Sequence, residues 1–239
     1  MKVSIVIPAY NEEAYLERTL EAARAQTYPD IEIIVVDNNS TDQTQDVARR
    51  FPAVRIVDEP RQGILYAREC GRRAATGDII VSMDADCLPH PAWVADAVRY
   101  FSDPSVVAVS GPYDLFDAPP FFHWSHLYSQ KLIFPVLTRV FYALFGRGVI
   151  AMGGNTFARA SALAAISGYD TRIKFYAEDM DTANRLATIG RVIYHNDIVM
   201  RTSARRYLKH GIMKIQGKYL LNYIWVVLFK RPYRNEFAE

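Results

Sequence analysis

The chain has 239 residues and a formal net charge of +2. Half of its residues are hydrophobic and 23% are charged, a balance that excludes an intrinsically disordered or low-complexity protein. Its two cysteines, Cys70 and Cys87, are too few for a disulfide framework or for a zinc site built from thiolates, and a reducing compartment fits them.

Predicted strands and helices alternate along the first half of the chain. Runs rich in β-branched residues predict strands at 3–7, 31–36, 54–57, 79–83 and 106–109. Helical patterns occupy 12–26, 42–51 and 64–76. Runs that are apolar on both faces suit buried parallel strands, so we predict an α/β fold of the nucleotide-binding type. The first run lacks a small-residue cleavage site, and we expect a strand there, not a signal peptide.

Polar residues follow three of the predicted strands. These segments are Pro8-Ala9-Tyr10-Asn11-Glu12, Asp37-Asn38-Asn39-Ser40-Thr41-Asp42 and Asp84-Ala85-Asp86. Ligands of such sheets bind beyond the carboxyl ends of the strands. One polar loop is ordinary, but three of them, each with a carboxylate, predict a binding site along one edge of the sheet.

The Asp84-Ala85-Asp86 triplet offers two hard oxygen ligands, provided that the chain turns there. Such ligands suit Mg²⁺ or Mn²⁺, which usually share their coordination shell with substrate phosphates. The triplet also suits a plain polar turn. Asp37 could accept a hydrogen bond from a base or a ribose hydroxyl, or cap the following helix, for which Asp42 is the better candidate.

Two later motifs suit a reaction site and also suit ordinary structure. Glu178 and Asp179 stand at the start of a predicted helix, where carboxylates interact favourably with free amides. One of them could instead take a proton from an acceptor hydroxyl. Gly153 and Gly154, followed by Asn155, permit a tight turn or a close approach of the backbone to a ligand.

The composition of the chain changes near residues 112–118, where we expect a soft boundary between subdomains. Residues 118–169 contain neither Asp nor Glu and many aromatic side chains. This stretch could be core, or it could face lipid or another apolar partner.

The C-terminal segment is basic. Residues 201–239 hold nine Lys or Arg and two Glu, a net of +7 that leaves −5 for the remainder. Apolar residues recur there at near-helical spacing with lysines between them, which predicts a basic, partly amphipathic helical tail. Such a helix could lie on an anionic membrane surface or pack on the body of the protein, and both fit equally. The longest apolar stretch, 219–229, is about half of the ~20 residues that a membrane span needs.

Four motifs occur in order: VSIVIPAYNEE, VDNNSTD, the DAD of IIVSMDADC and the AED of GYDTRIKFYAEDMD. This set resembles family 2 glycosyltransferases of the GT-A fold over about residues 3–200. The resemblance implies a mostly parallel central sheet flanked by helices, and transfer of a sugar from a nucleotide-diphosphate donor, UDP-sugar first, with inversion. We expect a nucleotide-sugar-binding half at 1–112, an acceptor-binding and catalytic half at 113–200, and a helical extension at 201–239.

The resemblance also implies roles for individual residues. Asp179 would be the catalytic base, and Glu178, Asn155 and Gly154 would border the acceptor or sugar. Asp86, with Asp84, would hold the metal ion. The nucleotide would contact Pro8, Ala9, Tyr10, Glu12, Asp37, Arg68, Asp84 and Ala85. Arg205 or Arg206 would close over the diphosphate.

The expected cofactor is Mg²⁺ or Mn²⁺. The expected acceptor is a hydroxyl or phosphate of a glycan or lipid-linked molecule, in cell-envelope or exopolysaccharide synthesis, and no nucleic acid partner is expected. We expect a cytoplasmic protein, or one peripheral at the inner face of the cell membrane.

Two other classes of protein stay open. A sugar-1-phosphate nucleotidyltransferase would need a Gly-rich basic phosphate loop after the first strand, where PAYNEE is acidic. A non-catalytic sugar-nucleotide binder would not need both DAD and AED.

Overall fold

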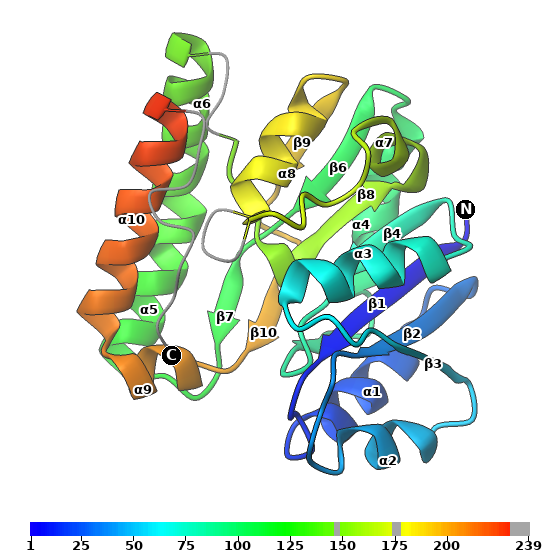
Figure 1. Ribbon diagram of the computed structural model, residues 1–239. Helices are drawn as coiled ribbons and strands as arrows, with labels where there is room; N and C mark the ends of the chain where they lie inside the picture. The colour runs from blue at the N-terminus through cyan, green and yellow to red at the C-terminus, as the bar shows by residue number, and fades with distance from the viewer. Residues whose placement is uncertain (146–148, 174–177, 230–239) are drawn as a thin grey trace.

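The computed structural model describes residues 1–145, 149–173 and 178–229 (Figure 1). Residues 230–239 of the predicted basic tail, and Ala177 of the AED motif, lie outside the described residues.

A central sheet runs through the body in the order β3-β2-β1-β4-β8-β6-β9. Its strands are β1 (Val3–Ala9), β2 (Ile31–Asp37), β3 (Val54–Asp58), β4 (Ile79–Ser82), β6 (Val106–Ser110), β8 (Thr156–Arg159) and β9 (Arg191–Tyr194). The strands β3, β2, β1 and β4 pair in parallel, as do β6 and β9. Only β8, of the strands described, pairs antiparallel with both neighbours, β4 and β6. The predicted α/β fold with a mostly parallel sheet is therefore confirmed.

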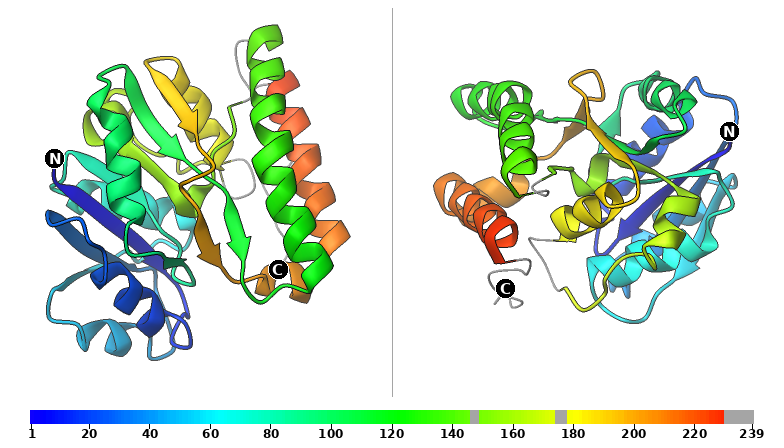
Figure 2. Two further views of the ribbon diagram at one scale, coloured as in Figure 1. Left: turned by 180° about the vertical axis from the view of Figure 1, so that it is seen from behind. Right: turned by 90° about the horizontal axis from the view of Figure 1, so that it is seen from above.

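Helices cover both faces of this sheet (Figures 1 and 2). One face packs on α1 (Leu16–Arg24), α2 (Thr44–Arg49) and α4 (Trp93–Val98), and the other on α3 (Ile64–Ala74), α7 (Ala160–Ala165) and α8 (Glu178–Ala187). The alternation of strand side chains explains the two cores. Ile5 and Ile7 of β1 belong to the first, while Val6 belongs to the second. The two hydrophobic cores hold the sheet between two layers of helices, and the loops at the carboxyl ends of its strands are thereby positioned.

A small second sheet, β5-β10-β7, lies beside the first. Its strands are β5 (Leu88–Pro89), β7 (Tyr113–Leu115) and β10 (Met200–Thr202). The strand β10 pairs antiparallel with β5 and parallel with β7. This pairing carries the start of the C-terminal segment back to the residues that follow β4.

Two helical segments stand side by side next to the body (Figures 1 and 2). The first runs through α5 (Pro120–Tyr128), a π-helical turn (Ser129–Ile133) and α6 (Phe134–Phe145), and the second through α9 (Arg205–His210) and α10 (Ile212–Phe229). We call residues 120–145 and 205–229 the helical arm. The ring centroids of Phe141 and Tyr223 lie 5.4 Å apart, and this contact joins the two parts of the arm. Among the described helices, none has the length and apolar character needed to cross a membrane.

Candidate active site

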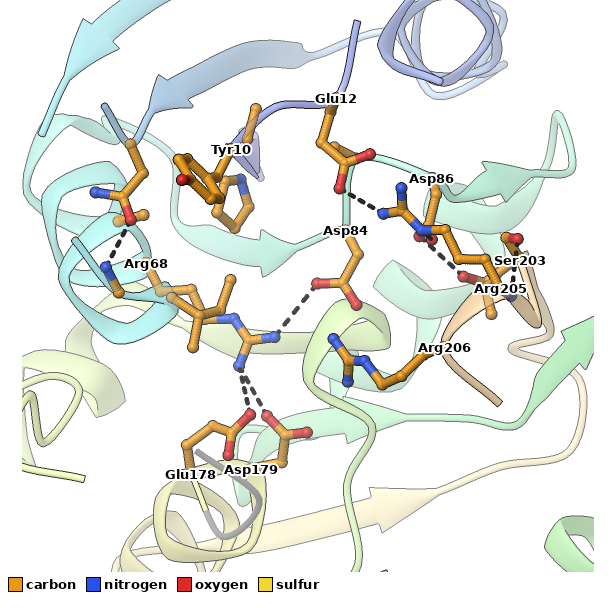
Figure 3. A pocket seen from close by; sticks show the side chains of 18 of the residues that line it. Tyr10, Glu12, Arg68, Asp84, Asp86, Glu178, Asp179, Ser203, Arg205 and Arg206 are labelled. Atoms are coloured by element: carbon orange, nitrogen blue, oxygen red, sulfur yellow. Dashed lines mark hydrogen bonds and ion pairs between the residues drawn. The ribbon is translucent and has the colours of Figure 1, made fainter. Parts of the chain in front are cut away.

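A cavity of about 340 Å³ opens at the carboxyl ends of β1 and β4 (Figure 3). Its walls combine the loop after β1, the start of α3, the turn after β4, the first turn of α8 and the chain around α9. Of the predicted site residues it is lined by Pro8, Ala9, Tyr10, Glu12, Arg68, Asp84, Ala85, Asp86, Glu178 and Asp179. The structure thus brings together residues that are far apart in the sequence, in a space that suits a small ligand.

Arg68 occupies the centre of the acidic wall of this cavity (Figure 3). It is 4% exposed, and its Nη1 lies 2.8 Å from Asp179 Oδ1 and 4.0 Å from Glu178 Oε1. Its Nη2 lies 3.3 Å from Asp84 Oδ1. Burial by itself lowers the pKa of Arg68, but the three carboxylates outweigh burial and raise that pKa. The guanidinium is therefore a fixed positive charge that joins α3, α8 and the turn after β4.

Glu178 and Asp179 form a carboxylate pair in the first turn of α8, in which Glu178 is buried and the side chain of Asp179 is 31% exposed. Burial raises the pKa of Glu178, the charge of Asp179 adds to this rise, and Arg68 opposes it. Burial also raises the pKa of Asp179, again against the effect of Arg68. Glu178 Oε2 has no hydrogen-bond partner among the described residues. Carboxylates with raised pKa values in a cavity are suited to accept a proton near neutral pH.

The chain turns sharply at Asp84-Ala85-Asp86, as two carboxylates sharing one ligand require. The amide of Cys87 donates to Asp84 O at 3.1 Å and closes the turn. The hydroxyl of Thr19 donates to Ala85 O at 2.7 Å and fixes the turn on α1. The turn therefore presents Asp84 and Asp86 to the cavity from a rigid base.

Asp86 has a positively charged neighbour. Arg205 Nε lies 3.1 Å from Asp86 Oδ2, and the Thr202 hydroxyl donates to Asp86 Oδ1 at 3.1 Å. Burial, together with the charge of Asp84, raises the pKa of Asp86 to about 6 despite Arg205. Arg205 also pairs with Glu12 Oε1, while Glu12 Oε2 is buried with no hydrogen-bond partner in the described part of the chain.

These carboxylates suit a divalent cation that is shared with a diphosphate. No group of three or more His, Cys, Asp or Glu side chains within the described ranges forms a ready-made metal site. A cation such as Mg²⁺ needs only one or two protein carboxylates when phosphate oxygens and water complete its shell. Asp84 and Asp86 are donors of this kind, and the buried free oxygen of Glu12 lies at the same wall.

Gly153 and Gly154 bring the backbone close to acidic side chains of the site. A Cβ atom on residue 153 would lie 2.0 Å from Asp179 Oδ1, and one on residue 154 would lie 2.4 Å from Asp84 Cγ. The close approach that the sequence suggested is therefore made to the protein's own carboxylates. Gly154 does not line the cavity in this structure.

Asn155 is also absent from the cavity wall. It is fully buried, and its Oδ1 accepts a hydrogen bond from Trp93 Nε1 at 2.9 Å. Its Nδ2 donates to the carbonyl oxygens of Ile198 at 2.7 Å and Gly111 at 3.0 Å. The amide is therefore committed to structural hydrogen bonds, and from this position it does not offer the expected contact with a sugar.

Asp37 ends β2 beside Ala9, its register partner on β1. It does not line the cavity, although Ala9 and the next residue, Asn38, do. Its Oδ1 is buried and has no hydrogen-bond partner among the residues described. Asp37 therefore lies just behind the wall of the cavity.

The sequence interpretation assigned no role to several residues that line the cavity: Gln62, Gly63, Tyr113, Thr202, Ser203, Tyr207 and Tyr219. Tyr113 follows β6 in the same way that the predicted site residues follow β1 and β4. Its position after a predicted strand could therefore have identified it as a site residue. Thr202 and Ser203 precede the basic pair Arg205 and Arg206. The pairing of β10 with β5 and β7 that brings them here has no signature in local sequence.

The fold and the cavity define an α/β protein with a cavity at the carboxyl edge of a mostly parallel sheet, the edge at which ligands of such sheets generally bind. The model of glycosyl transferase family 2 matches residues 4–166, which is more than half of the chain. The chain belongs to this family, as its motifs predicted.

Curated relatives agree with this membership. Glycosyltransferase AglE of Haloferax volcanii is 36% identical over 116 residues, which are 46% of this chain and 38% of the relative. WfaP of Escherichia coli, a UDP-Glc:alpha-D-GlcNAc-diphosphoundecaprenol beta-1,3-glucosyltransferase, is 31% identical over 142 residues, 58% of this chain and 50% of the relative. The matches thus span half or less of the length of these two relatives.

A solved structure extends the likeness to almost the whole chain. Mannosyltransferase PcManGT from Pyrobaculum calidifontis, in complex with GDP-Man and Mn²⁺, matches with a TM-score of 0.75 at 27% identity. The match covers 95% of this chain and 64% of that protein. The predicted GT-A fold is confirmed.

Proposed function

We propose that this protein transfers a sugar from a nucleotide-diphosphate donor to an oxygen of an acceptor, with inversion of the anomeric carbon. The observation that carries the proposal is the convergence around Arg68. Its guanidinium holds Asp84, one of the expected metal ligands, and Asp179, the expected base, at 3.3 Å and 2.8 Å in one cavity. Membership of glycosyl transferase family 2 supports the same reaction class.

The donor would enter with its nucleoside against the loop after β1. Pro8, Ala9 and Tyr10 line this end, and Tyr10 is 47% exposed, so its ring is available to a base. We retain Asp37 as a contact of the base because its buried Oδ1 lacks a partner in the described residues. UDP stays the first choice of nucleotide, although the complex of PcManGT holds GDP-Man.

Asp179 would act as the general base. It would take the proton of the acceptor hydroxyl while the acceptor oxygen attacks the anomeric carbon and the bond from that carbon to the diphosphate oxygen breaks on the opposite face. The raised pKa of Asp179 makes it a better proton acceptor than an ordinary aspartate, and Arg68 fixes its orientation. A base is needed for a hydroxyl but not for an ionised phosphate, so this site favours a hydroxyl acceptor.

Asp86, with Asp84 beside it, would hold Mg²⁺ or Mn²⁺. When bound, this cation would neutralise the charge that develops on the diphosphate leaving group. Without the cation, Arg205 supplies the positive charge at Asp86. We propose that Arg205 moves from Asp86 to the diphosphate when the donor binds, and that Arg206 also contacts the diphosphate. The Mn²⁺ in the PcManGT complex supports the choice of a divalent cation.

The acceptor would enter between α8 and the helical arm, because Tyr207 and Tyr219 of the arm line that side of the cavity. The cavity thus draws on all three proposed regions, 1–112, 113–200 and 201–239. A lipid-linked acceptor in cell-envelope or exopolysaccharide synthesis is supported by the diphosphoundecaprenol substrate in the name of WfaP. A cytoplasmic location, or a peripheral one at the inner face of the cell membrane, stays part of the proposal, and the free thiols of Cys70 and Cys87 fit the reducing compartment that it implies.

Thermal-shift measurements with nucleotides and nucleotide sugars, with and without Mn²⁺, test this function together with an assay for released nucleoside diphosphate. We expect one class of nucleotide sugar to raise the melting temperature in the presence of Mn²⁺ and to release nucleoside diphosphate when an acceptor is added. Pyrophosphate chemistry from a nucleoside triphosphate would indicate a nucleotidyltransferase. Binding without turnover of any donor and acceptor would indicate a sugar-nucleotide binder.

A further inference from the structure

The first part of the helical arm exposes an apolar stripe along its whole length. The stripe consists of Phe121, Trp124, Tyr128, Leu132, Val136, Val140 and Leu144, which recur every three or four residues and are all exposed. This spacing places them along one side of the segment from α5 to α6. Phe121 is 88% exposed and Leu144 is 70% exposed. The same segment buries Phe122, His126 and Gln130 on another side, so its inner contacts are already made.

The neighbouring helix α10 repeats this arrangement. It buries Ile215, Tyr223 and Val226 and exposes a further apolar set: Met213, Leu220, Leu221, Ile224 and Leu228. A helix that is apolar on more than one side is normally covered on each of them. Since α6 and α10 lie side by side, their exposed apolar residues belong to one structural unit (Figures 1 and 2).

The charge of the arm indicates what covers it. Residues 118–145 and 205–229 contain neither Asp nor Glu. Lys131, Arg139, Lys209 and Lys214 are distributed among the apolar residues. A second arm would bring like charges together, whereas an anionic bilayer offers apolar depth and negative headgroups at once. Trp124 and Tyr128 are also the side chains that favour the headgroup level of a membrane.

We propose that the helical arm is a membrane-docking surface, and that the stripe from Phe121 to Leu144 enters the interface of an anionic bilayer with the outer side of α10. The proposed membrane contact therefore involves α5 and α6 as well as the basic C-terminal segment. The rings of Phe122 and Tyr207, 5.2 Å apart, join α5 to α9 at the cavity. Docking would therefore hold the mouth of the cavity near the membrane surface. The docking itself does not rest on the proposed transfer reaction.

Flotation with vesicles tests this proposal on the full chain. Vesicles of phosphatidylcholine with phosphatidylglycerol are compared with vesicles of phosphatidylcholine alone. We expect binding to the anionic vesicles that weakens with added salt. The double variant Leu132→Glu, Val136→Glu should lower the bound fraction roughly tenfold or more, because two carboxylates enter the stripe. Ile189→Glu, at a 46% exposed position in the turn between α8 and β9, is the control for one carboxylate added outside the arm and should bind like the wild type.

The emission of Trp124 gives a second readout that does not depend on a disruptive variant. We expect a blue shift on vesicle binding and quenching by brominated lipids, both clearly smaller in Trp124→Phe, which retains Trp93 and Trp225. Failure to bind at low salt would overturn the proposal, as would equal binding by the double variant and Ile189→Glu. A stable dimer that the double variant converts to monomer, without vesicle binding by the wild type, would also overturn it and identify a second copy as the occupant.

Discussion

Arg68 Nη1 lies 2.8 Å from Asp179 Oδ1, and this ion pair joins two residues 111 positions apart in the sequence. Arg68 comes from the helix after β3, while Asp179 comes from the first turn of α8. Removing Asp179 would take one of three carboxylates from the buried Arg68, and removing Arg68 would leave Asp179 beside Glu178 without this counter-charge. The backbone of Gly153 passes directly against this pair.

Gly153→Ala should lower the transfer rate while the fold persists. The new Cβ atom would lie 2.0 Å from Asp179 Oδ1 and 2.5 Å from Arg68 Nη2, so the pair must shift. Both contacts are ends of side chains held in an ion pair, so the shift is opposed by that pair, and we expect a loss of stability of about 1–3 kcal/mol. A misplaced base should lower kcat roughly tenfold to a hundredfold. Steady-state kinetics and thermal melting measure the two effects. Gly217→Ala, with no neighbour within 4 Å of its Cβ, is the control, and a wild-type kcat in Gly153→Ala would contradict the geometry.

Arg205→Ala should strengthen binding of Mn²⁺ in the absence of nucleotide. Arg205 Nε lies 3.1 Å from Asp86 Oδ2, so a metal ion and this guanidinium compete for one carboxylate. We expect the dissociation constant for Mn²⁺ to fall roughly tenfold, measured by calorimetry on the free protein. Arg201→Ala removes a nearby cation that does not line the cavity and should leave the affinity unchanged. Weaker Mn²⁺ binding by Arg205→Ala would show that the two cations do not compete.

Asn155→Ala should reduce stability and not donor affinity. The substitution leaves the indole N–H of Trp93 and the carbonyls of Gly111 and Ile198 without their buried partner. We expect a loss of about 2–4 kcal/mol in the free energy of unfolding, measured with urea. If stability stayed the same and the KM for the donor rose, the sugar contact expected from the sequence would be the correct interpretation.

Acid should weaken the protein partly through His126 on α5. This imidazole ring is buried against Phe122 and Tyr207, and its centroid lies 5.4 Å from the ring centroid of each. Burial, with a smaller effect of His123, lowers the pKa of His126 to about 4, whereas in the unfolded chain it is about 6.5. The unfolded state therefore takes up a proton first as the pH falls. The stability that His126 contributes is complete above about pH 6.5 and is lost toward pH 4.

This loss should amount to roughly 1–3 kcal/mol between pH 7 and pH 4.5. Urea unfolding at several pH values measures it, with His126→Phe as the comparison because that variant keeps a ring in the same place. We expect the variant to show a correspondingly smaller loss. An identical pH dependence in both proteins would mean that His126 is not the group responsible.

Sequence patterns predicted the parts of the fold that depend on local chemistry. The β-branched runs of β1, β2 and β4 are long enough to identify buried strands, and their polar ends identified the edge where the cavity lies. The strand β8 was not predicted, because a segment of four residues at 156–159 has too few apolar positions to distinguish it from a loop. Its antiparallel insertion between β4 and β6 depends on tertiary packing alone.

The acidic residues of the candidate site could be predicted from the sequence, whereas the residues that contact them could not. The motifs containing Asp84, Asp86 and Asp179 could be recognised, but their common contact with one wall depends on how the chain folds. The same holds for Thr202, which reaches Asp86 across 116 positions through the pairing of β10. Asn155 shows the opposite case, since a polar residue after two glycines suits a ligand contact in sequence and is internal in the structure.

The role of Asp179 as the base is tested most directly by Asp179→Asn, with kcat and donor affinity measured side by side. Asp181→Asn is the matched control, because Asp181 lies on the same helix, pairs with Arg185 at 3.1 Å and does not line the cavity. We expect Asp179→Asn to lower kcat by about 10²–10⁴ while the dissociation constant of the donor with Mn²⁺ changes little. Transfer by Asp179→Asn at the rate of the wild type and of Asp181→Asn would contradict the account.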